Sequence, residues 1–218
     1  MNDRKFCFII CTNNSIYEKE CLHYINQLVV PDGYEMEIIC ITDAKSMTSG
    51  YNHGMKQCDA KYKIYLHHDV FIVNRNILSD ILNLFKRKEI GMIGVIGCRE
   101  LSEDAIMWKE DRVGMLYSHN VIMSKSCVFP EFEGEFCVVE AIDGLMMITQ
   151  YDIFWREDTF TKWDFYDISQ SREFQKQGYQ VVVPKTETPW CIHDDGFLDL
   201  KNYYEEREKY LKEYVLMN

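Results

Sequence analysis

Basic residues are scarce in this chain of 218 amino acids. It has 24 lysine and arginine residues against 35 aspartate and glutamate residues, which gives a formal net charge of −11. A surface with this balance repels a polyanion, so DNA and RNA are not expected partners. A small phosphorylated ligand is still compatible with the charge, because a local cation or a bound metal ion can neutralise it.

Long apolar runs and cysteine pairs are also missing. No run approaches the ~20 apolar residues that cross a bilayer, and the apolar stretch in MNDRKFCFIIC is too short for a signal peptide. The nine cysteines are scattered, odd in number and without CxxC spacing, which argues against a zinc ribbon or a disulfide framework. We therefore expect a protein of the reducing cytoplasm with no transmembrane segment.

The glycine-rich loops of common nucleotide-binding enzymes are absent after the first apolar run. Without GxGxxG or GxxxxGK[ST] there, the sequence supports neither a Rossmann oxidoreductase nor a P-loop kinase. The segment CTNNSIYEKE also lacks the glycine and basic residues that a sugar-nucleotide-forming nucleotidyltransferase needs. A metal hydrolase is a further alternative, although the sequence has no HExxH motif to support it.

The first half of the chain alternates strands and helices, the pattern of a parallel sheet with crossover helices. Apolar runs bounded by turn residues predict strands, and apolar residues at helical spacing predict helices. Ser15 and Glu18 predict a capping box at the first helix. The expected strands are residues 6–11, 37–42, 62–66 and 90–96, and the expected helices begin near residues 15, 49 and 77.

Residues 98–137 break this alternation. A long excursion inside a compact domain is usually functional or mobile, and we interpret this one as a lid or acceptor-side insertion. Regular elements are expected again at residues 136–148, a strand pair interrupted at Asp143-Gly144, then at 164–177 and 179–183.

A charged helix is expected over residues 198–215. Its apolar side chains would pack equally well against its own domain or against a second copy, so this helix is a candidate contact for a homo-oligomer. They are Tyr203, Tyr204, Tyr210, Leu211 and Tyr214.

Ionisable residues interrupt the apolar segment KYKIYLHHDVFIV. His67, His68 and Asp69 follow an apolar strand directly, and such side chains need partners or a wet cleft if they are buried. Asp43 follows the preceding strand, and the carboxyl ends of parallel strands share one edge of a sheet. Oxygen and imidazole ligands suit Mg²⁺ or Mn²⁺, with the distant His193 as a second candidate ligand.

The loop after the first strand is a candidate nucleotide site. Cys11, Thr12 and Asn13 offer backbone amides and short polar side chains that could hold a base, ribose or phosphate. Asn14 is explained equally well by ordinary helix capping. Asn52 either joins the nucleotide site or simply ends a turn of helix.

Together these motifs resemble family 2 glycosyltransferases of the GT-A fold, particularly a small bacterial glycosyltransferase-like subgroup, over roughly residues 6–193. The resemblance implies one α/β domain with a mostly parallel, Rossmann-like sheet flanked by helices and an elaborated C-terminal half. We divide it into a nucleotide-binding half (1–97), an acceptor-side half (98–196) and a C-terminal helix (197–218).

The resemblance also implies roles for the residues near the donor. Cys11, Thr12 and Asn13 would bind the nucleotide together with Asp43, Asn52 and His68. The segment His67-His68-Asp69 matches the family's metal-binding Asp-x-Asp, so Asp69 keeps a ligand carboxylate while His67 replaces the first aspartate. His193 matches the late histidine that completes the metal shell.

On the acceptor side, Asp143-Gly144 matches the family's Asp-Gly, and Tyr166-Asp167 aligns with its Glu-Asp pair, whose aspartate is the catalytic base. Asp164 is a rival base, but its position also suits an N-cap, which we prefer. Among five nearby aromatic residues, Trp163 and Tyr166 are the ones expected to meet a sugar ring.

The implied activity is transfer of a sugar from a nucleotide diphosphate donor, most simply a UDP-sugar, to a hydroxyl of a glycan or another acceptor. It would depend on Mn²⁺ or Mg²⁺, and a single base acting in line implies inversion. The histidine at position 67 and the tyrosine at position 166 depart from the family pattern. They motivate an alternative, a catalytically degenerate module that binds nucleotide-sugar without transferring it.

Overall fold

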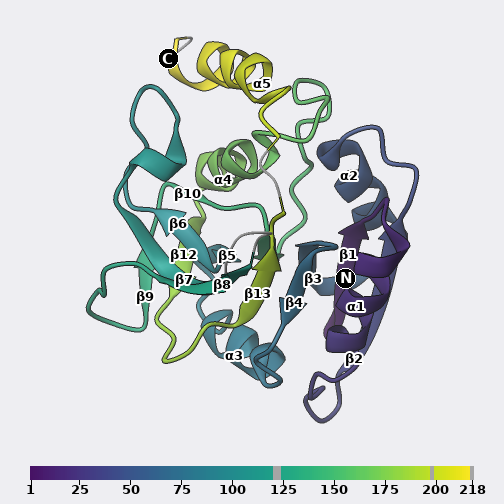
Figure 1. The fold of residues 1–218 in the computed structure, drawn as a ribbon. Coiled ribbons are helices and arrows are strands. Elements are labelled where there is room, and N and C mark those ends of the chain that lie inside the picture. The colour runs from purple at the N-terminus through teal and green to yellow at the C-terminus, as the bar shows by residue number, and fades with distance from the viewer. Residues whose placement is uncertain (120–123, 197–198, 217–218) are drawn as a thin grey trace.

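A computed structural model describes residues 1–119, 124–196 and 199–216, which form a sheet of seven strands and a smaller sheet of six. Figure 1 shows helices on both sides of the larger sheet. Five of its strands (β2, β1, β3, β5 and β12) run in one direction, while β11 and β9 run in the opposite one. In spatial order the strands are β2 (Glu35–Ile41), β1 (Asn2–Cys11), β3 (Ala60–His67), β11 (Met146–Thr149), β5 (Ile90–Gly94), β12 (Gln180–Pro184) and β9 (Phe136–Val138).

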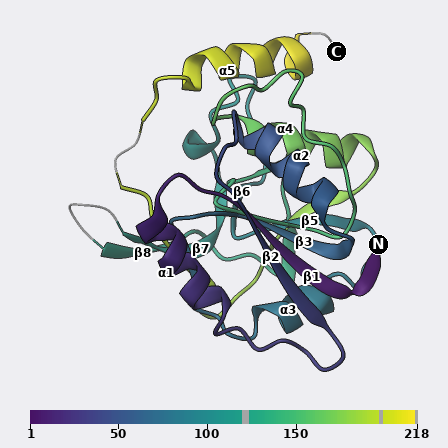
Figure 2. The ribbon, with the colours of Figure 1, turned by 90° about the vertical axis from the view of Figure 1, so that its right-hand side faces the viewer.

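The strand β1 is buried on both of its faces because helices cover both faces of the larger sheet. Phe6, Phe8 and Ile10 pack with α1 and α3, whereas Cys7 and Ile9 pack with α2 and α4. Figure 2 shows α2 and α4 on one side of the sheet and α3 on the other. The helices are α1 (Ser15–Ile25), α2 (Met47–Gln57), α3 (Ile77–Leu84) and α4 (Tyr166–Lys176).

The first helix starts where the sequence predicts but is capped differently. The Asn14 side chain accepts hydrogen bonds from the backbone amides of Ile16 (3.0 Å) and Tyr17 (3.4 Å). Asn14 is therefore the N-cap, and the capping box expected at Ser15 does not form.

The stretch expected to be an irregular insertion contributes to the smaller sheet instead. Within the described residues, β7 pairs with β8 as an antiparallel neighbour, and a short 3₁₀ turn, Met107–Lys109, precedes them. In β7, Ser118 is buried while Tyr117 and His119 are exposed, so no apolar–polar alternation marks the strand in the sequence. The smaller sheet consists of β10 (Ala141–Ile142), β6 (Ile96–Cys98), β7 (Arg112–His119), β13 (Cys191–Asp194) and β4 (Val70–Ile72), with β8 (Ser124–Val128) paired to β7.

The C-terminal helix α5 (Tyr203–Tyr210), extended by a π-helical turn over Leu211–Val215, lies over α4 (Figure 1). Tyr203, Tyr210 and Tyr214 are buried against Phe160 and Phe165 of the same chain. These tyrosines are therefore not available for the homo-oligomer contact proposed from the sequence; Tyr204 remains exposed.

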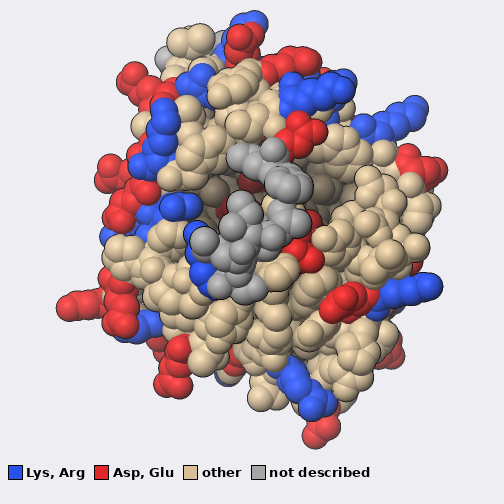
Figure 3. Space-filling model, viewed as in Figure 1, with Lys and Arg blue, Asp and Glu red and all other residues tan. Residues whose placement is uncertain are grey.

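The surface of the protein carries charged side chains of both signs. On the face shown in Figure 3, lysine and arginine side chains lie interspersed with aspartates and glutamates. Among the helices of the described residues, none has the length and apolar character needed to cross a bilayer.

Candidate functional site

The tips of three parallel strands meet at one edge of the larger sheet. Cys11, the last residue of β1, is in register with Ile41 at the end of β2 and with His67 at the end of β3. The amide of Thr12 donates to the carbonyl of Ile41 at 2.9 Å, which fixes the loop after β1 against β2. The carboxyl ends therefore share an edge, the usual position of a ligand site in an open α/β sheet.

His67, Asp69 and His193 converge beside this edge. One potential ligand atom from each lies within 4.8 Å of the other two. Asp69 Oδ1 is 3.8 Å from His67 Nδ1 and 3.7 Å from His193 Nε2. This oxygen is buried and has no hydrogen-bond partner among the described residues. A buried, unsatisfied carboxylate oxygen between two imidazoles is an arrangement that fits a divalent cation.

Strand pairing brings His193 across the chain to this cluster. Within β13, His193 is in register with Val70 of β4, which begins directly after Asp69. The amide of Asp194 also donates to the carbonyl of Asp69 at 2.9 Å. The two ligands predicted from the sequence, Asp69 and His193, are thus brought together.

His67 is a third potential ligand, in addition to the two expected from the sequence. Its Nε2 is hydrogen-bonded to the hydroxyl of Tyr166, which leaves Nδ1 facing Asp69. Burial lowers the pKa of His67 to about 4, partly opposed by the negative charge of Asp69. The imidazole is therefore neutral at pH 7 and has a lone pair to offer. The clue in the sequence was its place in the Asp-x-Asp motif.

A cavity of about 370 Å³ opens beside the cluster, within the size range of small-molecule sites. His68 shares a hydrogen bond of 3.2 Å with the Thr12 hydroxyl, and its ring stacks on Tyr17 with 5.5 Å between centroids. Trp163, expected on the acceptor side, is 44% exposed and lines this same cavity. The lining consists of Cys11, Thr12, Asn13, Ile41, Thr42, Ala44, Met47, His67, His68, Asp69 and Trp163.

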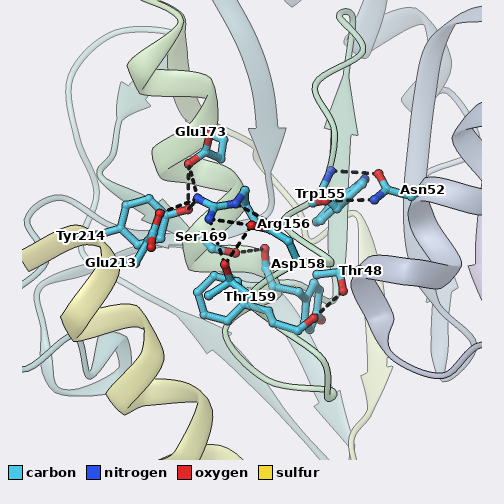
Figure 4. Close-up of polar contacts among 12 residues, drawn as sticks. Thr48, Asn52, Trp155, Arg156, Asp158, Thr159, Ser169, Glu173, Glu213 and Tyr214 are labelled. Atoms are coloured by element: carbon cyan, nitrogen blue, oxygen red, sulfur yellow. Dashed lines mark hydrogen bonds and ion pairs between the residues drawn. The ribbon is translucent and has the colours of Figure 1, made fainter.

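Two of the residues predicted to bind the nucleotide, Asp43 and Asn52, are not among the residues that line the cavity. Asp43 is exposed between Thr42 and Ala44, both of which line the cavity, so its place is at the rim. Asn52 is buried away from the lining: its amide group donates to the Trp155 carbonyl and accepts from the Trp155 amide, both at 2.9 Å (Figure 4). The Asn52 side chain uses both its nitrogen and its oxygen to join α2 to the loop before α4, which gives no support to nucleotide binding.

Asp143, Gly144 and Asp167 meet at the start of α4. The Gly144 amide donates to Asp167 Oδ2 at 3.0 Å, and the Ile168 amide donates to Asp167 Oδ1 at 2.8 Å. Asp143 Oδ1 accepts from the amide of Leu145 at 3.1 Å. Burial, with a further contribution from the charge of Asp143, raises the pKa of Asp167 to about 7.

Asp164 does not cap α4 as expected. The N-cap position belongs to Phe165, which has a left-handed backbone (φ 58°) and makes no side-chain capping bond. Burial, together with the nearby charges of Glu206 and Asp199, raises the pKa of Asp164 to about 6. These neighbours belong to the C-terminal segment.

Comparison with known protein families identifies the family of this chain. The model of the glycosyltransferase-like family matches residues 7–214. The chain belongs to this family. The residues recognised from the sequence therefore lie within a matched region that spans both sheets and the C-terminal helix. No curated protein sequence matches this family member.

Solved structures confirm the GT-A fold for this glycosyltransferase-like protein. TarS of S. aureus superimposes with a TM-score of 0.59 at 12% identity, covering 93% of this chain and 38% of TarS. The mannosyltransferase PcManGT of Pyrobaculum calidifontis gives 0.55 at 10% identity, covering 96% and 61%. GalNAc-T7 gives 0.60 at 9% identity, covering 95% and 48%. The chain thus spans less than two thirds of these three structures.

Proposed function

We propose that this protein transfers a sugar from a nucleotide diphosphate sugar to an acceptor hydroxyl with the help of a divalent cation. The observation that carries the proposal is the convergence of His67, Asp69 and His193 beside a cavity at the tips of β1, β2 and β3. Related folds support it: TarS was solved with UDP-GlcNAc, PcManGT with GDP-Man and Mn²⁺, and GalNAc-T7 with UDP, GalNAc and Mn²⁺.

The residues present fit a cation. Asp69 Oδ1 would hold it together with the imidazoles of His67 and His193. When bound, the cation would supply positive charge to offset the charge that develops on the departing diphosphate. Two imidazoles and one carboxylate favour Mn²⁺ over Mg²⁺, which prefers an all-oxygen shell and retains its water.

The cavity lining would bind the donor. Thr12 and His68 are held to each other and can present hydroxyl and ring nitrogen to the nucleotide, while Asp43 at the rim can accept from a base or ribose. Trp163 offers an exposed aromatic face to a ring of the donor. In this proposal the donor site is formed mainly by residues 1–97, and residues 98–196 supply Trp163, His193 and the acceptor side.

Asp167 would act as the base. A carboxylate with a pKa near 7 is suited to take a proton from an acceptor hydroxyl as that oxygen attacks the anomeric carbon. The amides of Gly144 and Ile168 orient the carboxylate, and each oxygen keeps a second lone pair for the acceptor. One base opposite the leaving group implies inversion, and Asp143 would help to orient the acceptor.

One observation favours the alternative of a binding-only module. Both Asp167 oxygens already accept backbone amides, which is also how a purely structural carboxylate would be used. Release of UDP or GDP from sugar donors, measured with and without Mn²⁺ and a mixture of glycan acceptors, separates the two readings. Transfer that is lost in Asp167→Asn supports the enzyme; Mn²⁺-dependent nucleotide binding without any turnover supports the module. Transfer that persists in Asp167→Asn moves the base to Asp164.

A further inference from the structure

The two departures from the family pattern touch each other. In the resemblance to family 2 glycosyltransferases, His67 takes the place of the first residue of Asp-x-Asp and Tyr166 the place of the glutamate before the base. These positions are 99 residues apart, yet His67 Nε2 and the Tyr166 hydroxyl form a hydrogen bond. We propose that they act as one unit, in which Tyr166 is a positioning residue that presents His67 Nδ1 to the cation. This inference rests on the proposed function.

The hydrogen bond occupies Nε2 of His67 and leaves Nδ1 as the nitrogen that can be a ligand. When Nε2–H donates to the Tyr166 hydroxyl oxygen, the proton resides on Nε2 and Nδ1 keeps a free lone pair. Nδ1 is also the nitrogen that faces Asp69, at 3.8 Å from Oδ1. A partner on the outer nitrogen fixes both the tautomer and the ring orientation of a ligand histidine. An aspartate at position 67 would need no such partner.

Tyr166 itself is held firmly enough to position another residue. It is 4% exposed, and its ring lies 6.0 Å from Tyr51 and 6.2 Å from Trp155, measured between centroids. Gly144 provides the space for its hydroxyl, because a Cβ at that position would lie 2.0 Å from the Tyr166 oxygen. The same glycine binds Asp167 through its amide. The loop at Gly144 thus fixes the positioning tyrosine and the proposed base side by side.

The test uses Mn²⁺ alone, titrated into the full chain and followed by electron paramagnetic resonance of the free ion. Tyr166→Phe removes the hydroxyl and keeps the ring, so we expect Mn²⁺ affinity to fall about 10- to 100-fold. Tyr51→Phe is the matched control. Its hydroxyl lies in the same aromatic cluster but has no hydrogen-bond partner among the described residues, so Mn²⁺ affinity should not change. Melting temperatures of both variants check that they remain folded.

A double-mutant cycle separates positioning from general damage. If Tyr166 acts through His67, adding Tyr166→Phe to His67→Ala should cause no further loss of Mn²⁺ affinity. Full additivity, or a Tyr166→Phe variant that binds Mn²⁺ as tightly as the wild type, would overturn the inference and leave the proposed function intact. A wild-type protein that binds no Mn²⁺ would overturn both.

Discussion

Asp69 combines features that are costly for folding and useful for binding a cation. Its Oδ1 is buried, lacks a hydrogen bond among the described residues, and has imidazole nitrogens on two sides. An unsatisfied buried polar atom costs about 1–3 kcal/mol. Residues of this kind lower stability in favour of activity, because the buried oxygen gains a partner only when the ligand binds.

Asp69→Asn should therefore abolish Mn²⁺ binding while leaving the melting temperature of the metal-free protein unchanged or slightly higher. The amide removes the charge that the cation requires but keeps the size of the side chain. Calorimetry with Mn²⁺ and thermal unfolding in chelator measure the two effects. A large loss of stability in chelator would mean that Asp69 has a structural role that the geometry does not reveal.

Asp167 predicts a pH dependence. Its pKa is raised to about 7, and a base must be deprotonated to act, so kcat/KM for transfer should rise as the pH increases through about 7 and then level off. The rate at the plateau should fall by at least about 100-fold in Asp167→Asn, within the usual contribution of a general base. A profile that is flat between pH 5 and 9 would remove Asp167 from the role.

At the scale of elements, the site depends on contacts that join the two halves of the chain. Asn52 ties α2 to Trp155, and Thr48 donates to the Phe160 carbonyl at 2.6 Å. Arg156, which follows Trp155 in the loop before α4, is ion-paired with Asp158 and Glu213 (Figure 4). The loop before α4 is thereby held between α2 and the C-terminal helix, which fixes Trp163 at the cavity.

Asn52→Ala tests the structural role assigned to this residue. It removes two buried hydrogen bonds and leaves the Trp155 amide without its partner, while the Trp155 carbonyl still accepts from the Glu157 amide at 2.8 Å. The free energy of unfolding should therefore fall by about 1–3 kcal/mol. UDP affinity in Mn²⁺ should stay within about twofold of the wild type in the folded protein. Asn13→Ala, at the cavity, is the contrasting variant and should weaken UDP binding without a loss of stability. The opposite pattern would return Asn52 to the nucleotide site.

Gly144→Ala probes the loop that serves both Tyr166 and Asp167. The added methyl group must displace the Tyr166 hydroxyl, so we expect a loss of about 1–3 kcal/mol in stability and weaker Mn²⁺ binding. Gly178→Ala controls for the backbone: its φ of +84° is strained for alanine, but a Cβ there meets no atom within 4 Å. That control should lose stability and keep its Mn²⁺ affinity. Equal Mn²⁺ affinity in both variants would show that Gly144 does not support the cation site.

For the whole molecule, the elements that could be predicted are those that a short stretch of sequence determines by its own pattern. Buried parallel strands are continuous apolar runs, so β1 and β3 were found along with the polar residues at their tips. The strand β7 escaped prediction because it buries Ser118 and exposes Tyr117. The place of His67 in the Asp-x-Asp motif was a clue to a ligand role, but the Tyr166 contact that leaves its Nδ1 facing Asp69 lies 99 residues away, and no local pattern encodes it. Asn52 was predicted to bind the nucleotide because the sequence does not distinguish an asparagine that bonds to the protein backbone from one that binds a ligand.

The proposed function requires a nucleotide diphosphate and a cation to bind together beside Asp69. The most direct measurement is isothermal titration calorimetry of UDP into the full chain, with Mn²⁺ and then with excess chelator. We predict at least about tenfold tighter binding with Mn²⁺, a coupling of about 1.4 kcal/mol or more, which disappears in Asp69→Asn. UDP binding of equal strength with and without Mn²⁺, or no binding of UDP or GDP under either condition, would contradict the proposed function.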